Sequence, residues 1–322
     1  MLKKCLGLAM AALSIAAHAQ TDFPSRPIRL VVPFAPGGPT DGVARVVADD
    51  IGKRLGQTIA VENKAGATGV IGQDFVSKAP PDGHTIVAIT STSSNNYHLM
   101  GRPLDFYKDF AMIGRIYNTY TVLAINPKAP GMENIQNLQQ LAAYIKAHPG
   151  ALNYTSSGSG SLGHLTMEKV KLHFGLDIQH INYKGQAQAM QDVMAGRIPI
   201  ISATFTIAPQ ILSGQLRGIA IGTPQPSPHL PQVGTFRSQG MPDLVSAVWV
   251  GLAAPPSTPK AIVDRWSDEL RISLAKPEVA SRLQAVVGTE SEYLSASEFA
   301  AYATRDFAYW GAVIKEGGIK GE

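Results

Sequence analysis

Cysteine is almost absent from this chain, which has a single one, Cys5, among 322 residues. Cys5 lies within an N-terminal stretch that we expect to be removed on export, so the mature protein should contain no disulfide, no thiolate metal ligand and no cysteine nucleophile. An exported chain without disulfides must be stabilised by large hydrophobic cores, and about 300 residues suffice for two domains with such cores.

Long hydrophobic runs are missing too, since no stretch approaches the ~18 apolar residues that a membrane-spanning helix needs. The apolar run at residues 6–17 is preceded by Lys3 and Lys4 and ends in the small-residue motif Ala17-His18-Ala19. This arrangement is typical of a secretory signal peptide. We therefore expect cleavage after about Ala19 and export of the mature protein.

The residue patterns of several functional classes are also missing. The eight histidines show no HxH or HExxH spacing, and no pair of carboxylates stands out for acid–base catalysis. The formal net charge is +4, of which Lys3 and Lys4 supply two, and the remaining lysines and arginines are scattered. The sequence therefore predicts no metal, no cofactor, no catalytic residue and no nucleic-acid partner, and we expect a monomer.

Strand-like and helix-like runs alternate along the chain, and this order is typical of parallel sheets covered by helices on both faces. In the first half, strands at 28–33, 58–62 and 84–90 alternate with helices at 43–55 and 66–78. In the second half, strands at 152–155, 178–183, 198–202 and 216–222 alternate with helices at 138–146, 162–174 and 187–195. The regions 259–274 and 296–314 are predicted to be mostly helical.

Two apolar β-like stretches that end in proline, residues 121–127 and 248–255, lie between these units. If both cross between the same two lobes they form a hinge, and ligands commonly bind in the cleft between such lobes. The pattern alone fits two interior strands of one sheet equally well. Our prediction is a two-lobed α/β fold, each lobe a mainly parallel sheet flanked by helices. The predicted boundaries are 1–19 for the signal peptide, 20–122 plus 248–322 for lobe 1, and 123–247 for lobe 2.

Two glycine-rich turns share one design, a strand followed by glycines and then by a helix start. The first is Pro36-Gly-Gly-Pro-Thr-Asp41, called here the PGG turn, and the second, residues 156–163, is the Ser-Gly loop. Uncovered backbone N–H groups at a helix N-terminus favour an anion. Tight turns also use glycine for steric reasons alone. One such turn in each predicted lobe suggests that the two hold opposite ends of one anionic ligand.

A third polar segment, residues 90–96, follows the strand at 84–90 and includes Ser91 and Ser93. We expect it to form a loop that opens into the cleft, because ligands bind outside the carboxyl ends of such strands.

The Ser-Gly loop contains Gly158-Ser-Gly-Ser-Leu-Gly163, which matches the dinucleotide-binding pattern G-x-G-x-x-G. A nicotinamide site would also need an acidic residue at the end of the next strand, whereas that strand ends in Tyr-Lys-Gly and Asp177 precedes it. A nucleophile elbow, G-x-S-x-G, does not fit residues 156–161 in any register. His164 is interpreted as a first-turn residue that bonds the loop or the ligand. An exported α/β hydrolase acting on a carboxylate derivative remains the alternative function.

Several motifs occur in the order of one known family, over essentially the whole mature chain. They are FPSRPIRLVVPFAPGGPTD (23–41), VENKAG (61–66), APPDG (79–83), LNY (152–154), SGSGSLGHL (157–165), YKG (183–185), WVGLAAP (249–255) and the segment 310–320. On these motifs the chain resembles the Bug (TctC-like) extracytoplasmic solute receptors of tripartite tricarboxylate transporters. The resemblance implies a two-lobed periplasmic binding protein that closes on a carboxylate and delivers it to membrane permease subunits, without catalysis.

The resemblance also implies which residues contact the ligand, often through ordered water. Many family members carry Asp or Asn just after the strand at 198–202, where this chain has Ser202, Ala203 and Thr204. We therefore expect a ligand without an ammonium group. A di- or tricarboxylate with an apolar or aromatic body is the hypothesis, with Phe34 and Phe205 as apolar walls. The predicted ligand-binding residues are Phe34, Gly37, Gly38, Thr40, Asp41, Ser91, Ser93, Ser157, Gly158, Ser161, His164, Thr204 and Phe205.

Overall fold

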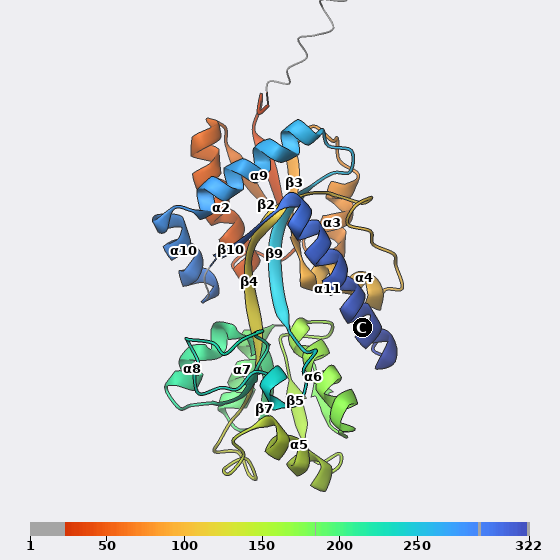
Figure 1. The fold of residues 1–322 in the computed structure, drawn as a ribbon, viewed down its shortest axis with the longest axis vertical. Coiled ribbons are helices and arrows are strands. Elements are labelled where there is room, and N and C mark those ends of the chain that lie inside the picture. The colour runs from red at the N-terminus through yellow and green to blue at the C-terminus, as the bar shows by residue number, and fades with distance from the viewer. Residues whose placement is uncertain (1–22, 184, 289–290, 321–322) are drawn as a thin grey trace, which may run out of the picture.

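The computed structural model describes residues 23–183, 185–288 and 291–320, so the predicted signal peptide lies outside the described residues. Figure 1 shows two lobes, one above the other, with strands β4 (Ala111–Ile125) and β9 (Ala247–Ala254) running between them. The upper lobe is lobe 1 and the lower one is lobe 2. Among the described residues, no helix has both the length and the apolar character that crossing a bilayer requires.

Lobe 1 is built on a mixed sheet with a core on each face. Strands β2 (Ile59–Asn63), β1 (Ile28–Val32) and β3 (Thr85–Thr90) are parallel, and β9, β4 and β10 (Ser291–Ser295) continue the sheet in antiparallel pairs. Successive residues of β1 point to opposite faces of the sheet, so Leu30 packs in the hydrophobic core on one face and Val31 in the core on the other. One face is covered by α2 (Pro39–Leu55), α9 (Lys260–Leu274) and α10 (Pro277–Val287), and the other by α3 (Val70–Ser77), α4 (Ser91–Leu99) and α11 (Ala296–Glu316).

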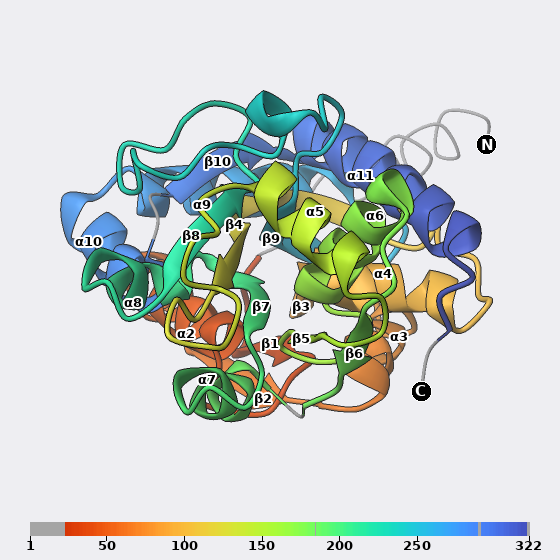
Figure 2. The same ribbon diagram turned by 90° about the horizontal axis from the view of Figure 1, so that it is seen from below.

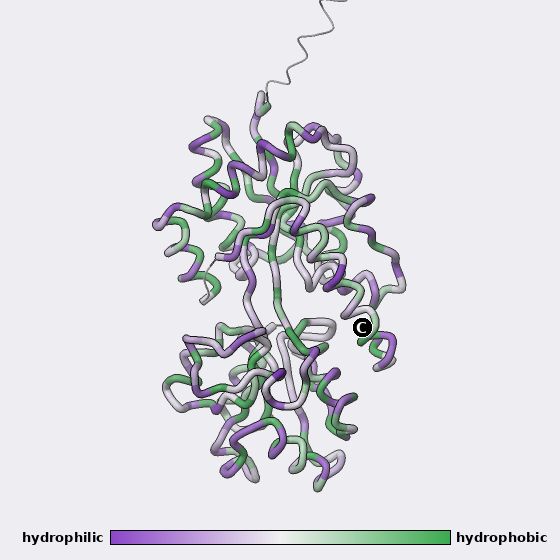
Figure 3. Tube along the Cα trace, in the orientation of Figure 1, coloured by the Kyte–Doolittle hydropathy of each residue, from purple (hydrophilic) through white to green (hydrophobic). Residues whose placement is uncertain are grey.

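Lobe 2 repeats this plan with shorter strands. Strand β5 (Asn153–Thr155) pairs in parallel with β6 (Gln179–Ile181) and β7 (Ile200–Thr204), while β4 pairs antiparallel with β7 and β8 (Arg217–Ile221). Seen from below in Figure 2, α5 (Leu138–Ala147) and α6 (Leu162–Phe174) lie on one side of these strands. Helices α7 (Gln186–Met194) and α8 (Ala208–Leu212), with the short helix η3 (Phe205–Ile207), lie on the other. In Figure 3 the hydrophobic segments concentrate on the strands and inner helix faces of both lobes.

The fifteen-residue strand β4 belongs to both lobes. Residues 111–120 pair with β9, and part of this stretch also pairs with β10. Residues 121–125 pair with β7, and 122–125 also pair with β8. The crossing strands are therefore also interior strands of a continuous ten-stranded sheet. The two-lobed α/β fold is confirmed, although the part of the sheet in each lobe is mixed rather than mainly parallel, because both crossing strands run antiparallel to their neighbours.

Helix α11 makes a further connection between the lobes, running from lobe 1 down beside lobe 2 (Figure 1). Its first turns place Phe299 and Ala303 in the lobe 1 core, and its last turns place Trp310 in the lobe 2 core. Between them lies the half-buried Asp306, whose carboxyl accepts hydrogen bonds from Trp249 Nε1 at 2.7 Å and Trp310 Nε1 at 3.2 Å. The last turns of α11 therefore share the core of lobe 2.

Candidate functional site

A cleft of about 620 Å³ lies between the two lobes. Its hinge side consists of Tyr117 and Thr119 on β4 and Val248 on β9, three residues that we call the cleft floor. Thr119 and Val248 are register partners across the two crossing strands. The lining residues are Phe34, Ala35, Pro36, Gly37, Gly38, Pro39, Thr40, Thr68, Thr90, Thr92, Tyr117, Thr119, Ser157, Gly158, Ser159, Ser161, Gly185, Gln186, Thr204, Thr206, Val248 and Val287.

Four helix N-termini meet at this cleft, two from each lobe. Gly38 caps α2, Thr90 caps α4, Ser161 caps α6 and Gly185 caps α7, and all four caps are lining residues. Each N-terminus carries partial positive charge on N–H groups that have no partner within the helix. Among the described lining residues, no side chain is charged. The cleft can therefore hold an anion through N–H groups and hydroxyls, without a side-chain cation.

The PGG turn is held in place by Asp41. Its carboxylate accepts from Gly37 N at 3.0 Å, from Arg45 Nε and Nη2 at 3.0 Å each, and from Asn63 Nδ2 at 2.9 Å. The hydrogen bond from Arg45 is the largest cause that lowers the pKa of Asp41 to about 2. Asp41 is only 4% exposed and does not line the cleft, so the structure gives this predicted ligand residue a supporting position.

We expect Asp41→Asn to weaken carboxylate binding about tenfold, roughly 1.4 kcal/mol. An amide has one acceptor oxygen and would turn its NH₂ toward donors, so it cannot satisfy Gly37, Arg45 and Asn63 together. Isothermal titration calorimetry would measure the change in affinity.

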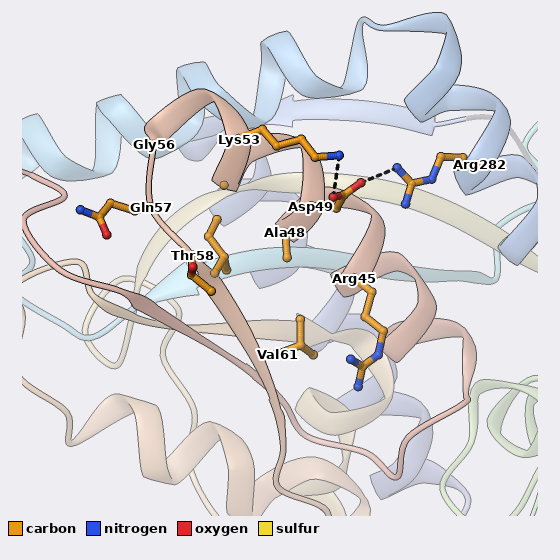
Figure 4. Close-up of a pocket in the computed structure, with 11 residues that line it drawn as sticks. Arg45, Ala48, Asp49, Lys53, Gly56, Gln57, Thr58, Val61 and Arg282 are labelled. Atoms are coloured by element: carbon orange, nitrogen blue, oxygen red, sulfur yellow. Dashed lines mark hydrogen bonds and ion pairs between the residues drawn. The ribbon is translucent and has the colours of Figure 1, made fainter.

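The matched control is Asp49→Asn on the same helix. Asp49 is paired with Lys53 at 2.8 Å and Arg282 at 2.9 Å in a surface pocket beside α2 and β2 (Figure 4). Removing the charge of Asp49 should leave the affinity for the carboxylate ligand unchanged. Equal affinities for Asp41→Asn and wild type would contradict the supporting role of Asp41. The cations at Asp49 are already paired there, so we do not treat that pocket as a ligand site.

The Ser-Gly loop is organised around Ser156, whose hydroxyl meets Gly158 N at 3.2 Å, Ser161 Oγ at 3.1 Å and His180 Nε2 at 2.9 Å. Ser161 caps α6 by accepting from His164 N, and Gly160 N donates to His164 Nδ1 at 3.1 Å. Ser157, Gly158, Ser159 and Ser161 line the cleft. His164 does not line it, because its ring is buried against His180 with the ring centroids 4.2 Å apart.

The third predicted segment is not a loop, so that prediction is wrong. Residues 91–99 form α4, because the side chains of Thr90 and Ser93 make a reciprocal capping box. Ser91 and Ser93 are fully buried, and Ser93 Oγ accepts from Gln73 Nε2 at 2.6 Å. The cleft is lined instead by Thr90 and Thr92. Ser, Thr and Asn disfavour helix interiors, which is why the composition of this segment indicated a loop.

Of the two predicted residues near the end of β7, one lines the cleft and the other is buried. Thr204 lines the cleft and donates to Gln186 Oε1 at 3.2 Å, while Gln186 Nε2 donates to Thr206 Oγ1 at 2.7 Å. Phe34 also lines the cleft, whereas Phe205 is buried in a lobe 2 core, so Phe205 is not an apolar wall.

Eight of the predicted residues line the cleft, namely Phe34, Gly37, Gly38, Thr40, Ser157, Gly158, Ser161 and Thr204. Sequence reasoning missed Gly185 and Gln186, although the Tyr-Lys-Gly motif ending at Gly185 marks a helix start. It also missed the cleft floor, whose position depends on the pairing of β4 with β9.

Comparison with known proteins supports this arrangement. The chain is 32% identical to Protein BugT of Bordetella pertussis over 98% of this chain and 97% of BugT. The structure of MatC from Rhodopseudomonas palustris with bound malate is 26% identical, covers 91% of this chain and 100% of MatC, and has a TM-score of 0.76. Another R. palustris structure, with adipate, is 28% identical over 92% of this chain and 99% of that one, with a TM-score of 0.77.

The sequence profile of one family, described as the tripartite tricarboxylate transporter family receptor (TctC), matches residues 43–319. Since this match spans most of the chain and full-length relatives share its fold, the protein belongs to the TctC family of solute-binding receptors.

Proposed function

We propose that this receptor captures a small di- or tricarboxylate in the periplasm and delivers it, as a monomer, to the membrane permease subunits of a tripartite tricarboxylate transporter. The observation that carries the proposal is the meeting of four helix N-termini, two from each lobe, at a cleft lined by no charged described side chain. The relatives solved with malate and adipate support a dicarboxylate. The proposed lobes are 20–122 with 248–322, and 123–247, after removal of the signal peptide, with the last turns of α11 packed against the core of lobe 2.

The walls of the cleft restrict the body of the ligand. Phe34, Val248 and Val287 supply apolar surface, and no described lining residue is a carboxylate that could pair with an ammonium group. Burying an unpaired ammonium costs several kcal/mol. The proposed ligand is therefore anionic at its ends and uncharged between them, with an aromatic body as one option.

We propose binding without catalysis. A serine–histidine pair does exist, since Ser156 Oγ lies 2.9 Å from His180 Nε2. Ser156 is fully buried, neither residue lines the cleft, and the hydroxyl is engaged by the Ser-Gly loop. This geometry disfavours the hydrolase alternative, because a nucleophile must reach the substrate.

A thermal-shift panel of carboxylates tests the proposal. A bound dicarboxylate at one hundred times its Kd should stabilise the protein by about 2.7 kcal/mol, a rise in Tm of roughly 4 °C. Calorimetry should then give a stoichiometry of one with no product formed. Stabilisation by amino acids alone, or turnover of carboxylate esters or amides, would contradict the proposal.

A further inference from the structure

A second cavity, which we call the hinge groove, lies on the other side of the crossing strands from the cleft. Successive residues of a strand point to opposite sides. On β4, Tyr117 and Thr119 line the cleft, whereas Asn118 and Tyr120 line the hinge groove. The groove has a volume of about 610 Å³, similar to the 620 Å³ of the cleft. The crossing strand β4 therefore separates two cavities of comparable size.

The two walls of the hinge groove belong to different lobes. The lobe 1 wall is made by β10 and the first half of α11, where Ala301 and Arg305 line the groove. The lobe 2 wall is made by Pro224 and Val245, which come from the segment between β8 and β9. In Figure 2 this segment lies on the same side of the molecule as β10 and α11. A change in the angle between the lobes must therefore change the width of the groove.

Both walls are firmly attached to their own lobes. Arg115 on β4 donates to the carbonyl oxygen of Glu292 at 3.0 Å and to its carboxylate at 2.9 Å. The guanidinium of Arg115 also lies 4.9 Å from the ring centroid of Tyr302 on α11. In lobe 2 the wall segment is held through Ser246, whose hydroxyl lies 2.6 Å from Thr166 Oγ1 on α6. Extra volume in the groove should therefore change the angle between the lobes rather than deform either wall.

The strand pairing places the bending point of β4 beside the groove. Strand β10 pairs with β4 as far as Tyr117, and β8 pairs with it from Val122 onward. Among the described residues, neither strand pairs with residues 118–120, whose register partners all lie on β9. A hinge rotation at this stretch that widens the cleft narrows the groove, because the two cavities lie on opposite sides of β4.

We propose that the hinge groove sets the balance between the open and closed receptor, because the cleft can open only as far as the groove walls can approach each other. Added side-chain volume in the groove then holds the cleft closed, and removed volume lets it open further. Arg305 is exposed and makes no hydrogen bond or ion pair with the described residues, so its side chain acts as a spacer between the walls. The effect on ligand release rests on the proposed function, whereas the movement of the lobes is independent of ligand identity.

Spin labels measure this movement without a ligand. Cys5 is the only cysteine of the chain and lies in the predicted signal peptide. Lys53→Cys on α2 and Gln188→Cys on α7, both at exposed positions, therefore give one label in each lobe of the processed protein. Pulsed electron paramagnetic resonance gives the distribution of distances between the labels. Ala301→Phe should reduce the share of long separations about threefold, and Arg305→Ala should increase it about twofold or more.

Ala308→Phe is the matched control, because it makes the same change on the same helix at an exposed position that does not line the groove. It should leave the distance distribution unchanged. Val245→Phe adds volume from the lobe 2 wall and should act as Ala301→Phe does. The dicarboxylate that raises Tm most in the thermal-shift panel should also dissociate about threefold more slowly from Ala301→Phe, as measured by stopped-flow displacement.

Equal distance distributions in the wild type, both groove phenylalanine variants and Arg305→Ala would overturn the inference. A shift of the same size in Ala308→Phe would also overturn it. Arg305→Ala removes an exposed, unpaired side chain, so it decides the question even if neither groove phenylalanine variant folds. If the panel shows no carboxylate ligand while the separations shift as expected, the proposed function fails and the role of the groove stands.

Discussion

Replacing Gly163 with alanine is expected to destabilise the protein by about 3 kcal/mol or more and to weaken ligand binding at the same time. A Cβ at this position would lie 2.1 Å from the carbonyl oxygen of Ser202 on β7 and 2.9 Å from its carbonyl carbon. Both are backbone atoms of a central strand, so the start of α6 must move away. Ser161, the cap of α6, lines the cleft and would move with it.

Urea unfolding and calorimetry with a bound dicarboxylate measure the two effects. Gly175→Ala is the matched control at the other end of α6, where a Cβ would meet nothing within 4 Å. Its left-handed φ of 64° gives a cost of about 1 kcal/mol without an effect on binding. If the two variants are equally stable, the close approach of α6 to β7 is not important for the fold.

The three glycines of the G-x-G-x-x-G pattern are thus required for different physical reasons. Gly158 and Gly160 have φ of 135° and 70°, which favour glycine, and Gly163 allows close contact between helix and strand. Dinucleotide-binding turns use glycine for related reasons. The pattern predicted the backbone geometry from the sequence. The missing acid on the next strand, the export signal and the matching PGG turn indicated a carboxylate instead of a dinucleotide.

The second large effect concerns pH and Asp306. Burial raises the pKa of this carboxyl in the folded protein to about 7, from a model-peptide value of 3.8. Between these two pH values Asp306 is ionised in the unfolded chain but protonated in the folded protein. Its contribution to the unfolding free energy therefore falls as the pH rises from about 4 to about 7 and is constant above pH 7. The contribution is at most on the order of 4 kcal/mol over this window, because Asp306 is half-buried and solvent screens part of the effect.

Asp306→Asn should remove this slope. One indole, of Trp249 or Trp310, would face the amide NH₂ and lose its acceptor, so the variant should be less stable than wild type by about 1–3 kcal/mol near pH 4.5. The deficit should shrink or reverse near pH 8. Urea unfolding of both proteins between pH 4.5 and 8.5 gives the difference in unfolding free energy, and a difference independent of pH would refute the assignment.

The effect of Asp306 must be measured as the difference between wild type and Asp306→Asn, because His180 changes the stability of both proteins with pH in the opposite direction. Burial, followed by the charge of neighbouring His164, lowers the pKa of His180 to about 3. Its imidazole stays neutral in the folded protein while it titrates near 6.5 when unfolded, so it removes stability as the pH falls from about 6.5 toward 3. The two contributions partly cancel in the wild type between pH 4 and 6.5.

Features set by neighbouring residues could be predicted from the sequence. The strand-turn-helix units placed Gly37, Gly38, Thr40 and Ser161 at one site, because glycines and caps act within a few residues. The capping box of α4 is also formed by neighbouring residues, but the polar composition of residues 90–96 led to the prediction of a loop. Its partners, Thr90 and Ser93, would have revealed it.

Features that depend on distant pairing could not be predicted. The predicted stretch 121–127 includes only the last five residues of the fifteen-residue β4. The preceding ten residues include Gly114 and Arg115 and are stabilised by β9 and β10 from far along the chain. The cleft floor depends on the same pairing. The opposite orientations of Asp41, turned inward, and Thr40, facing the cleft, depend on Arg45 and Asn63.

The C-terminal helix has a consequence for the kinetics of ligand exchange. Two strands alone would let the lobes rotate about them, but α11 is anchored in both cores through Phe299 and Trp310. Wide separation of the lobes requires either bending this 21-residue helix or withdrawing a fully buried tryptophan, which costs about 3 kcal/mol. We therefore expect small opening excursions, with the residence time of the ligand set by how often the last turns of α11 detach.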